Sequence, residues 1–187
     1  MDDLDRACVG LLVAWTVHDL EELATMPRES RRVMDRLPRW VPLPEGFRDR
    51  GLSQREVTLA IASVGAVMAG ALLAGLRTRG RSPLFRGAVL AFGLHGVGHL
   101  AASIGTRGYT TGVATAPLVV LPYWLHARRV LGRHGLTECD GPAVTVALAG
   151  VPLTVAAHLL SCSVLGHRVL GPRALGSLPT SGVEPGV

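Results

Sequence analysis

The sequence predicts an all-helical integral-membrane protein, a bundle of about five transmembrane helices. The chain has 187 residues, of which 48% are hydrophobic and only 18% are charged, whereas soluble domains are usually about 25% charged. The mean hydropathy is +0.35. The apolar residues gather in runs close to the roughly 20 residues that a helix needs to cross a bilayer. None of these runs alternates with a period of two, so strands are not expected.

Five apolar runs account for the expected helices, and they cover residues 7–26, 56–76, 84–105, 111–131 and 142–167. The second to fifth runs are rich in Gly, Ala and Ser, which allow helix backbones to approach closely in membranes. Pro117, Pro122 and Pro152 are expected to kink the fourth and fifth helices, because proline lacks the amide donor that a helix interior uses.

We interpret residues 1–170 as a single membrane-embedded domain. The segment 27–55 carries four prolines and eight arginines, and we expect an interfacial loop there, with ESRRVMDRL as a short amphipathic helix. The tail 171–187 is rich in Gly, Pro and Ser and is predicted to be disordered.

The formal charge is +5, and every basic residue is an arginine. These arginines lie in short segments between the apolar runs, where membrane topology and anionic lipid head groups explain them. Membrane lipids are therefore expected partners, and no nucleic acid is expected, because the basic residues form no clustered face of the kind that binds it.

The first apolar run ends in an unusual group of ionisable side chains, within WTVHDLEELATMP. Helical spacing places His18, Glu21 and Glu22 on one face, at positions i, i+3 and i+4. Asp19 lies about 100° around the helix, near an edge of that face. A structural alternative is that this helix end already lies at the interface, with both glutamates in water.

The third and fifth runs carry further histidines, and the second and fourth runs are almost free of ionisable residues at the same level. His95 and His99 are one turn apart in the third run, and His158 lies in the fifth. With a rise of about 1.5 Å per residue, these histidines and His18 reach one depth, just past the midplane. Each histidine alone would more simply be a hydrogen-bonded structural residue, but their common depth favours a shared site.

The cost of these groups in a membrane indicates what the site holds. A carboxylate at the centre of a membrane helix costs about 2.5–3.5 kcal/mol, so several together need compensation, and no Lys or Arg lies among them. Imidazole and carboxylate are ligands that suit Zn or Fe, so we expect a divalent metal, as one ion or two. The expected ligands are His18, Glu22, His95, His99 and His158.

The remaining acidic groups have expected roles in catalysis. Glu21 and Glu22 are the candidate catalytic residues, with Glu21 as a bridging ligand or general base. Asp19 is expected to support a ligand or to be an edge charge.

Two segments resemble the HXXEE-domain family of bacterial and archaeal membrane proteins. The first is HDLEE at residues 18–22, and the second is HGVGHL…TRGYTTG at 95–112, an HxxxH followed by Arg-x-Tyr-x-x-Gly. The resemblance covers about residues 7–165. It implies a multi-pass protein of the bacterial cytoplasmic membrane, with a His/Glu active site carried here by His18, Glu21, Glu22, His95 and His99. The family pattern has Pro before the glycine, where this chain has Thr111, which leaves the geometry of that turn open.

A site inside one leaflet meets substrates that dissolve there, so a lipid or an isoprenoid is the expected substrate. Arg107 and Tyr109 emerge on the same side and are candidates to bind an anionic head group. The first hypothesis is a metal-dependent membrane enzyme that catalyses hydrolysis with Zn or oxidation with Fe.

Other functions are compatible with the same residues. Glu21 or Glu22 could act without a metal, as the general acid of an isoprenoid cyclase or isomerase. An intramembrane His/Glu cluster could also belong to a proton or metal-ion transporter, or to a structural membrane protein. Grouping at one level favours a site over a pathway, which would need ionisable groups across the full thickness of the membrane.

Overall fold

The structure, a computed structural model, describes residues 1–36 and 50–166. It is all-helical in this part, as predicted, and contains no strand there. The five α-helices are α1 (Asp3–Arg36), α3 (Gln54–Thr78), α4 (Pro83–Thr106), α5 (Leu121–Arg133) and α6 (Gly141–Gly166). A short π-helix, η1 (Ala116–Val120), leads directly into α5.

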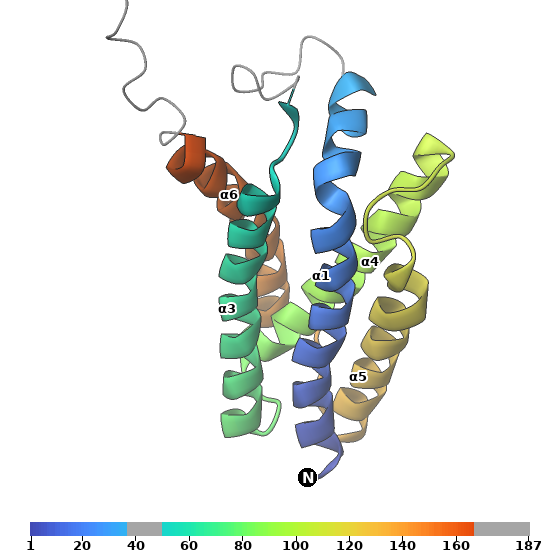
Figure 1. The fold of residues 1–187 in the computed structure, drawn as a ribbon. Coiled ribbons are helices and arrows are strands. Elements are labelled where there is room, and N and C mark those ends of the chain that lie inside the picture. Colours follow the sequence, from blue (N-terminus) through green and yellow to red (C-terminus); the bar gives the residue numbers. More distant parts are fainter. Residues whose placement is uncertain (37–49, 167–187) are drawn as a thin grey trace, which may run out of the picture.

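The helices form a bundle in which successive members alternate in direction (Figure 1). α1 packs against α3 on one side and against η1 and α5 on the other. α4 packs mainly on α6, and α6 also packs on α3. α4 crosses α1 obliquely with little contact, and α1 and α6 do not touch within the described residues.

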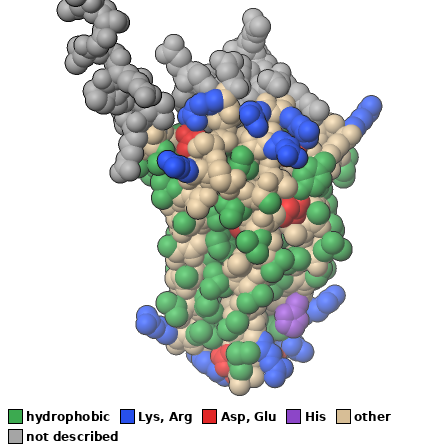
Figure 2. All heavy atoms as spheres, in the orientation of Figure 1, with side chains coloured by type: hydrophobic (Ala, Val, Ile, Leu, Met, Phe, Trp, Pro, Cys, Tyr) green, Lys and Arg blue, Asp and Glu red, His purple; other side chains and the backbone are tan. Residues whose placement is uncertain are grey.

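Within residues 1–36 and 50–166, three helices are long and apolar enough to cross a membrane: Gln54–Thr78, Pro83–Thr106 and Gly141–Leu165. Figure 2 shows apolar side chains over the middle of the visible face and arginines at both ends. α1 and α5 lack this overall composition, but they too expose large apolar side chains, such as Val13, Leu20 and Leu125. The chain therefore has the character of a membrane protein, and the five predicted crossings stay a prediction.

α1 is longer than the sequence indicated. It continues through Pro27 to Arg36. The segment ESRRVMDRL is therefore helical up to Arg36, but it is a continuation of α1 and not a separate short helix within a loop from residue 27. Pro27 has no amide to donate to the carbonyl of Leu23 one turn earlier, and Gln54 Nε2 donates to that carbonyl instead, at 3.0 Å. In the rest of the expected loop, residues 51–53 are non-helical and α3 begins at Gln54, while residues 37–49 lie outside the described residues, as does the expected disordered tail 171–187.

The fourth predicted helix begins irregularly, and Pro122 explains why. Pro122 has no amide for the usual bond to residue 118, and the amide of Leu121 donates to Ala116 O, five residues back, which is π-helical spacing. The helix then packs against a glycine of α4, since a Cβ at Gly93 would lie 2.2 Å from the Trp124 ring. This close approach brings η1 and α5 against the middle of α4.

Hydrogen bonds and an ion pair hold the start of α4 against the start of α6. Both lie at the end of the bundle opposite residues 107–115. Asp140 accepts a hydrogen bond from the Ala143 amide at 3.0 Å, which caps the start of α6. It also pairs with Arg86, a buried residue near the start of α4, which donates to Thr137 O at 2.8 Å as well.

Candidate metal centre

Four of the predicted ligands come together where α1 and α4 cross. His18 and Glu22 come from α1, and His95 and His99 come from α4. In each helix the two residues are four apart, so both side chains project from the same face. One potential ligand atom from each of the four residues lies within 4.8 Å of the others.

The ligand atoms surround a space of the size that a first-row metal ion needs. Oε1 of Glu22 lies 3.0 Å from Nε2 of His99, 3.6 Å from Nε2 of His95 and 3.8 Å from Nε2 of His18. The Nε2 atoms of His95 and His99 are 2.8 Å apart. Bonds of about 2.0–2.2 Å to Zn²⁺ place tetrahedral ligand atoms about 3.3–3.6 Å apart, close to this arrangement.

Two atoms at the centre of the group lack the partners that buried polar atoms normally have. Among the described residues, six buried side-chain atoms make no hydrogen bond, and two of them, Nε2 of His18 and Oε1 of Glu22, face each other in this group. Oε1 is near His99 without the alignment of a hydrogen bond. Buried polar groups are almost always paired, and a cation bound between these two atoms would satisfy both.

The group is closed on one side and open on the other. The side chain of His18 is fully buried and that of Glu22 is 7% exposed. The side chains of His99 and His95 are 12% and 41% exposed. The opening therefore lies at His95 on α4, a helix that also exposes the apolar residues Leu94 and Val97.

Glu21 lies outside the group and binds the connection between α4 and η1. Its Oε1 accepts hydrogen bonds from the Tyr109 hydroxyl at 2.5 Å and the Ala114 amide at 3.2 Å. Its Oε2 accepts from the amide and the hydroxyl of Thr115, at 2.8 and 2.6 Å. Burial and the bond to Glu21 raise the pKa of Tyr109, so the phenol keeps its proton and donates. These four bonds hold Glu21 to the connection, outside the four grouped residues, and its expected catalytic role stays a prediction.

Gly112 allows this connection to pass directly over two of the histidines. Its φ is +76°, and a Cβ there would lie 2.7 Å from Cε1 of His99 and 2.8 Å from Cε1 of His18. The preceding Thr111 shares a hydrogen bond with Thr25 of α1, at 2.6 Å between the hydroxyl oxygens. The turn therefore forms with threonine where the family pattern has proline.

Thr115 is a residue that the sequence analysis missed. Its Oγ1 lies 2.7 Å from Nδ1 of His18, on the side of the ring away from the other ligands. The only sequence signal for it is a hydroxyl three residues after Gly112, at the start of an apolar run. Asp19, which was expected beside a ligand, is buried on α1 and is not one of the four grouped residues.

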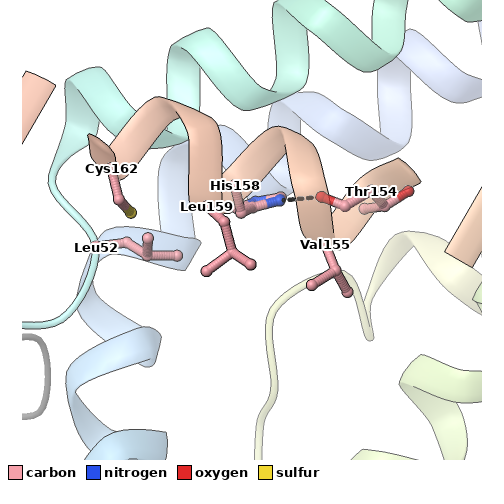
Figure 3. Close-up of a pocket in the computed structure, with 6 residues that line it drawn as sticks. All are labelled: Leu52, Thr154, Val155, His158, Leu159 and Cys162. Atoms are coloured by element: carbon pink, nitrogen blue, oxygen red, sulfur yellow. Dashed lines mark hydrogen bonds between the residues drawn. The ribbon is translucent and has the colours of Figure 1, made fainter. Parts of the chain in front are cut away.

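His158 is the expected ligand that the structure does not bring to the group. It donates from Nδ1 to the carbonyl of Thr154 in its own helix, at 3.0 Å. Its side chain lines a separate apolar groove of about 230 Å³, beside Leu52 and Cys162 (Figure 3). Because α6 does not contact α1 within the described residues, a matching depth does not bring His158 to His18.

Arg107 and Tyr109, the predicted substrate-binding residues, line a cleft of about 370 Å³ between the end of α1 and the turn that follows α4. The α1 side of the cleft contains Arg32 and Glu29, which form an ion pair at 2.7 Å. Through the bond between Tyr109 and Glu21, this cleft adjoins the α1 segment that carries the grouped ligands.

These features define a helical protein with membrane-type helices and a His/Glu group that can hold a metal ion. The chain belongs to the HXXEE family: the family model described as a protein of unknown function with HXXEE motif matches residues 9–127. That range includes all four grouped residues and the connection that covers them, and it ends before α6. No curated protein and no solved structure matches the chain.

Proposed function

We propose that this protein is a metal-dependent membrane enzyme that acts on a lipophilic substrate at the group formed by His18, Glu22, His95 and His99. The observation that carries this proposal is the pair of buried atoms without hydrogen-bond partners, His18 Nε2 and Glu22 Oε1, 3.8 Å apart. Three imidazole nitrogens and one carboxylate oxygen converge at that point, and such a donor set binds divalent first-row metals.

The number of ligands bears on the choice of metal. Four protein ligands fill a tetrahedral Zn²⁺ shell, whereas catalytic zinc sites keep one position open. A six-coordinate ion such as Fe²⁺ would keep two positions free for substrate or oxygen, so we favour oxidation with iron. Hydrolysis with zinc is the second candidate, and it requires that the most exposed ligand, His95, leave its position to water. Either ion would supply Lewis-acid chemistry, and iron would add redox chemistry.

The surroundings of the opening support a lipophilic substrate, either a lipid or an isoprenoid. His95 is the exposed ligand, and it lies on α4, a helix that also exposes Leu94 and Val97 (51% and 44%) and is long and apolar enough to cross a membrane. A ligand exposed on such a helix suits a substrate that arrives from within a membrane rather than from water.

The cleft at Arg107 supports an anionic head group on that substrate. Within the described residues Arg32 is neutralised by Glu29, while Arg107 makes no ion pair there. A guanidinium is well suited to bind phosphate or carboxylate. The Tyr109 hydroxyl lies between this cleft and Glu21, so one amphipathic molecule could place its head in the cleft and its chain at the opening.

Two other functions are less well supported. An acid-catalysed isoprenoid cyclase without a metal needs a carboxyl group that can deliver a proton, and Glu21 accepts hydrogen bonds at both oxygens instead. A proton or metal-ion transporter needs ionisable groups across the full thickness of the membrane. Here the grouped residues lie at one crossing of α1 and α4, and the ion pairs of the described part lie toward the helix ends.

Metal analysis of the detergent-purified protein tests the proposal. We expect about one divalent ion per wild-type chain and a loss of that ion in H95A/H99A and in Glu22→Gln. The matched control is His134→Ala, because the His134 ring pairs with Asp3 at a helix end, at 3.0 Å, away from the grouped ligands. A wild-type protein without bound metal after growth and purification with added Fe²⁺ or Zn²⁺ would overturn the metal-dependent function.

A lipid assay tests the substrate class. Total bacterial lipid extract is incubated in vesicles with the zinc-loaded protein, or with the iron-loaded protein in air with a two-electron reductant such as ascorbate, and is analysed by mass spectrometry. Gain of one oxygen atom by a lipid, with the second atom of O2 reduced to water, identifies oxidation. Cleavage of a lipid into two products whose masses add up to the lipid plus one water identifies hydrolysis. Arg107→Asn should reduce turnover and keep the metal, since asparagine tolerates the left-handed backbone there (φ 51°). Arg79→Asn, with φ 54° at the opposite end of the bundle, is the control.

A further inference from the structure

We infer that Glu21 and Thr115 are positioning residues that fix the tautomer of His18, so that its Nε2 is free to bind a metal ion. This inference deepens the proposed function and rests on it for its consequence, but the tautomer itself is a property of the metal-free protein. It also gives different roles to the two adjacent glutamates of the family motif: Glu22 faces the ion, and Glu21 acts through Thr115.

The first step is the direction of the hydrogen bond between Glu21 and Thr115. Oε2 of Glu21 receives the Thr115 amide at 2.8 Å and the Thr115 hydroxyl at 2.6 Å. Oε1 receives the Tyr109 hydroxyl and the Ala114 amide. Because amides can only donate, and both oxygens receive one, the carboxylate acts as an acceptor at both oxygens. The Thr115 hydroxyl proton therefore points to Glu21.

The second step is the bond between Thr115 and His18. A hydroxyl has one proton, and the one on Thr115 is directed to Glu21. Among the described residues, the one further acceptor that this hydroxyl reaches is the carbonyl of Gly112, at the longer distance of 3.4 Å. Toward Nδ1 of His18, at 2.7 Å, Oγ1 must accept. Nδ1 therefore carries the ring proton, and Nε2 carries the lone pair.

The third step explains the two unpartnered atoms of the candidate metal centre. With the proton on Nδ1, Nε2 of His18 and Oε1 of Glu22 are both acceptors, and they face each other at 3.8 Å without a hydrogen atom between them. Two buried lone pairs in this arrangement are unfavourable alone and favourable around a cation. In metal sites the distal nitrogen of a ligating histidine commonly donates to a fixed acceptor, which sets the tautomer.

The test combines Thr115→Val, Thr115→Ser and Glu21→Gln with a titration of Co²⁺, whose absorption spectrum reports its ligands. Loss of such an outer partner typically weakens metal affinity about 10–100-fold, and we expect this for Thr115→Val. Thr115→Ser keeps the hydroxyl and should keep the affinity. Glu21→Gln should weaken binding too, because its amide can donate to Oγ1, turn the hydroxyl toward Nδ1 and place the ring proton on Nε2.

A matched control separates an effect on the His18 tautomer from a loss of stability in the connection between α4 and η1. Thr25→Val removes the bond to Thr111 between the same two segments without touching a ligand, so its Co²⁺ affinity should equal that of the wild type. Nitrogen-15 NMR of the metal-free protein reads the tautomer directly, and we expect a protonated Nδ1 on His18.

Each outcome has a separate meaning. A protonated Nε2 in the wild type, or Thr115→Val with wild-type affinity, would overturn the inference. A protonated Nδ1 that Glu21→Gln moves to Nε2 supports it, even in a wild-type protein that binds no Co²⁺. The absence of Co²⁺ binding in the wild type would instead count against the proposed metal function.

Discussion

Gly112 and His99 lie in direct contact, so that a single added methyl group at Gly112 would come within 2.7 Å of the His99 ring. The same methyl group would lie 2.8 Å from the ring of His18 on the other helix. One glycine therefore sets the distance between the histidines of α1 and α4 and the segment that covers them, and it does so in a backbone conformation (φ +76°) that disfavours other residues.

Gly112→Ala should therefore weaken metal binding more than the small size of the added methyl group suggests. Ligands must be held within about 0.5 Å of their working geometry, and the added Cβ requires a shift of that order in His18, His99 or the turn. We expect metal affinity to fall by about 10–100-fold or more, where that range is typical for loss of a group that hydrogen-bonds to a metal ligand. The helix content measured by circular dichroism should not change. Gly98→Ala is the control, because a Cβ at Gly98 meets nothing within 4 Å. Equal affinities of the two variants would contradict the prediction.

His158→Ala should leave metal binding unchanged. Its imidazole is held within α6 by the Thr154 carbonyl, and α6 does not contact α1 within the described residues. Metal content and the Co²⁺ spectrum of the purified variant should match the wild type, whereas His99→Ala should lose the ion. Loss of metal in His158→Ala would mean that α6 lies closer to the centre than this structure places it.

The contribution of Gln54 to stability should depend on the presence of Pro27. Its amide donates to the Leu23 carbonyl, which Pro27 leaves without a helical donor. A single hydrogen bond of this kind contributes about 0.5–1.5 kcal/mol, so Gln54→Leu should lower the free energy of unfolding in detergent by about that amount, at the low end because the site is exposed.

A double-mutant cycle with Pro27→Ala checks this origin. Alanine restores the amide donor to Leu23 within α1, so Gln54→Leu should cost less in the Pro27→Ala background than in the wild type. Equal costs in the two backgrounds would assign the role of Gln54 to another contact.

The ion pair between Arg86 and Asp140 should make stability fall in acid. The Ala143 amide and then Arg86 hold the pKa of Asp140 below its usual value. The contribution of this carboxylate is therefore complete above the ordinary aspartate pKa of about 3.9 and is lost as pH falls through that value toward the lower pKa of the folded state. Asp140→Asn keeps an acceptor for the Ala143 amide and removes the charge. Its unfolding temperature should lie below that of the wild type at neutral pH and converge with it in acid, and a constant difference would contradict this.

The i, i+4 spacing of His18 with Glu22 and of His95 with His99 made much of the candidate centre predictable, because helical geometry fixes which side chains share a face. Depth along the helices was also informative for these four residues. Depth does not show which helices are in contact, however. His158 reaches the same depth and is therefore predicted as a ligand, although its helix does not contact α1 within the described residues. Thr115 could not be found because a threonine in an apolar run has no spacing relation to a histidine nearly a hundred residues earlier.

Pro27 shows a second limit of reading a sequence. Proline followed by arginine-rich polar residues is typical of a loop, and the end of α1 was accordingly placed near residue 26. The helix continues because a distant side chain, Gln54, supplies the missing hydrogen bond. Compensation of this kind depends on tertiary contacts, which local propensity does not contain.

The small contact between α1 and α4 has a mechanical consequence. Each of the two helices supplies two ligands, so an ion bound there would be a cross-link across the weakest seam of the bundle. Folding and metal occupancy would then be thermodynamically linked, with each tenfold excess of free ion over its dissociation constant adding about 1.4 kcal/mol to the stability of the native state. A chelator would act on such a protein as a mild denaturant, and the bundle would open first along the seam between α1 and α4.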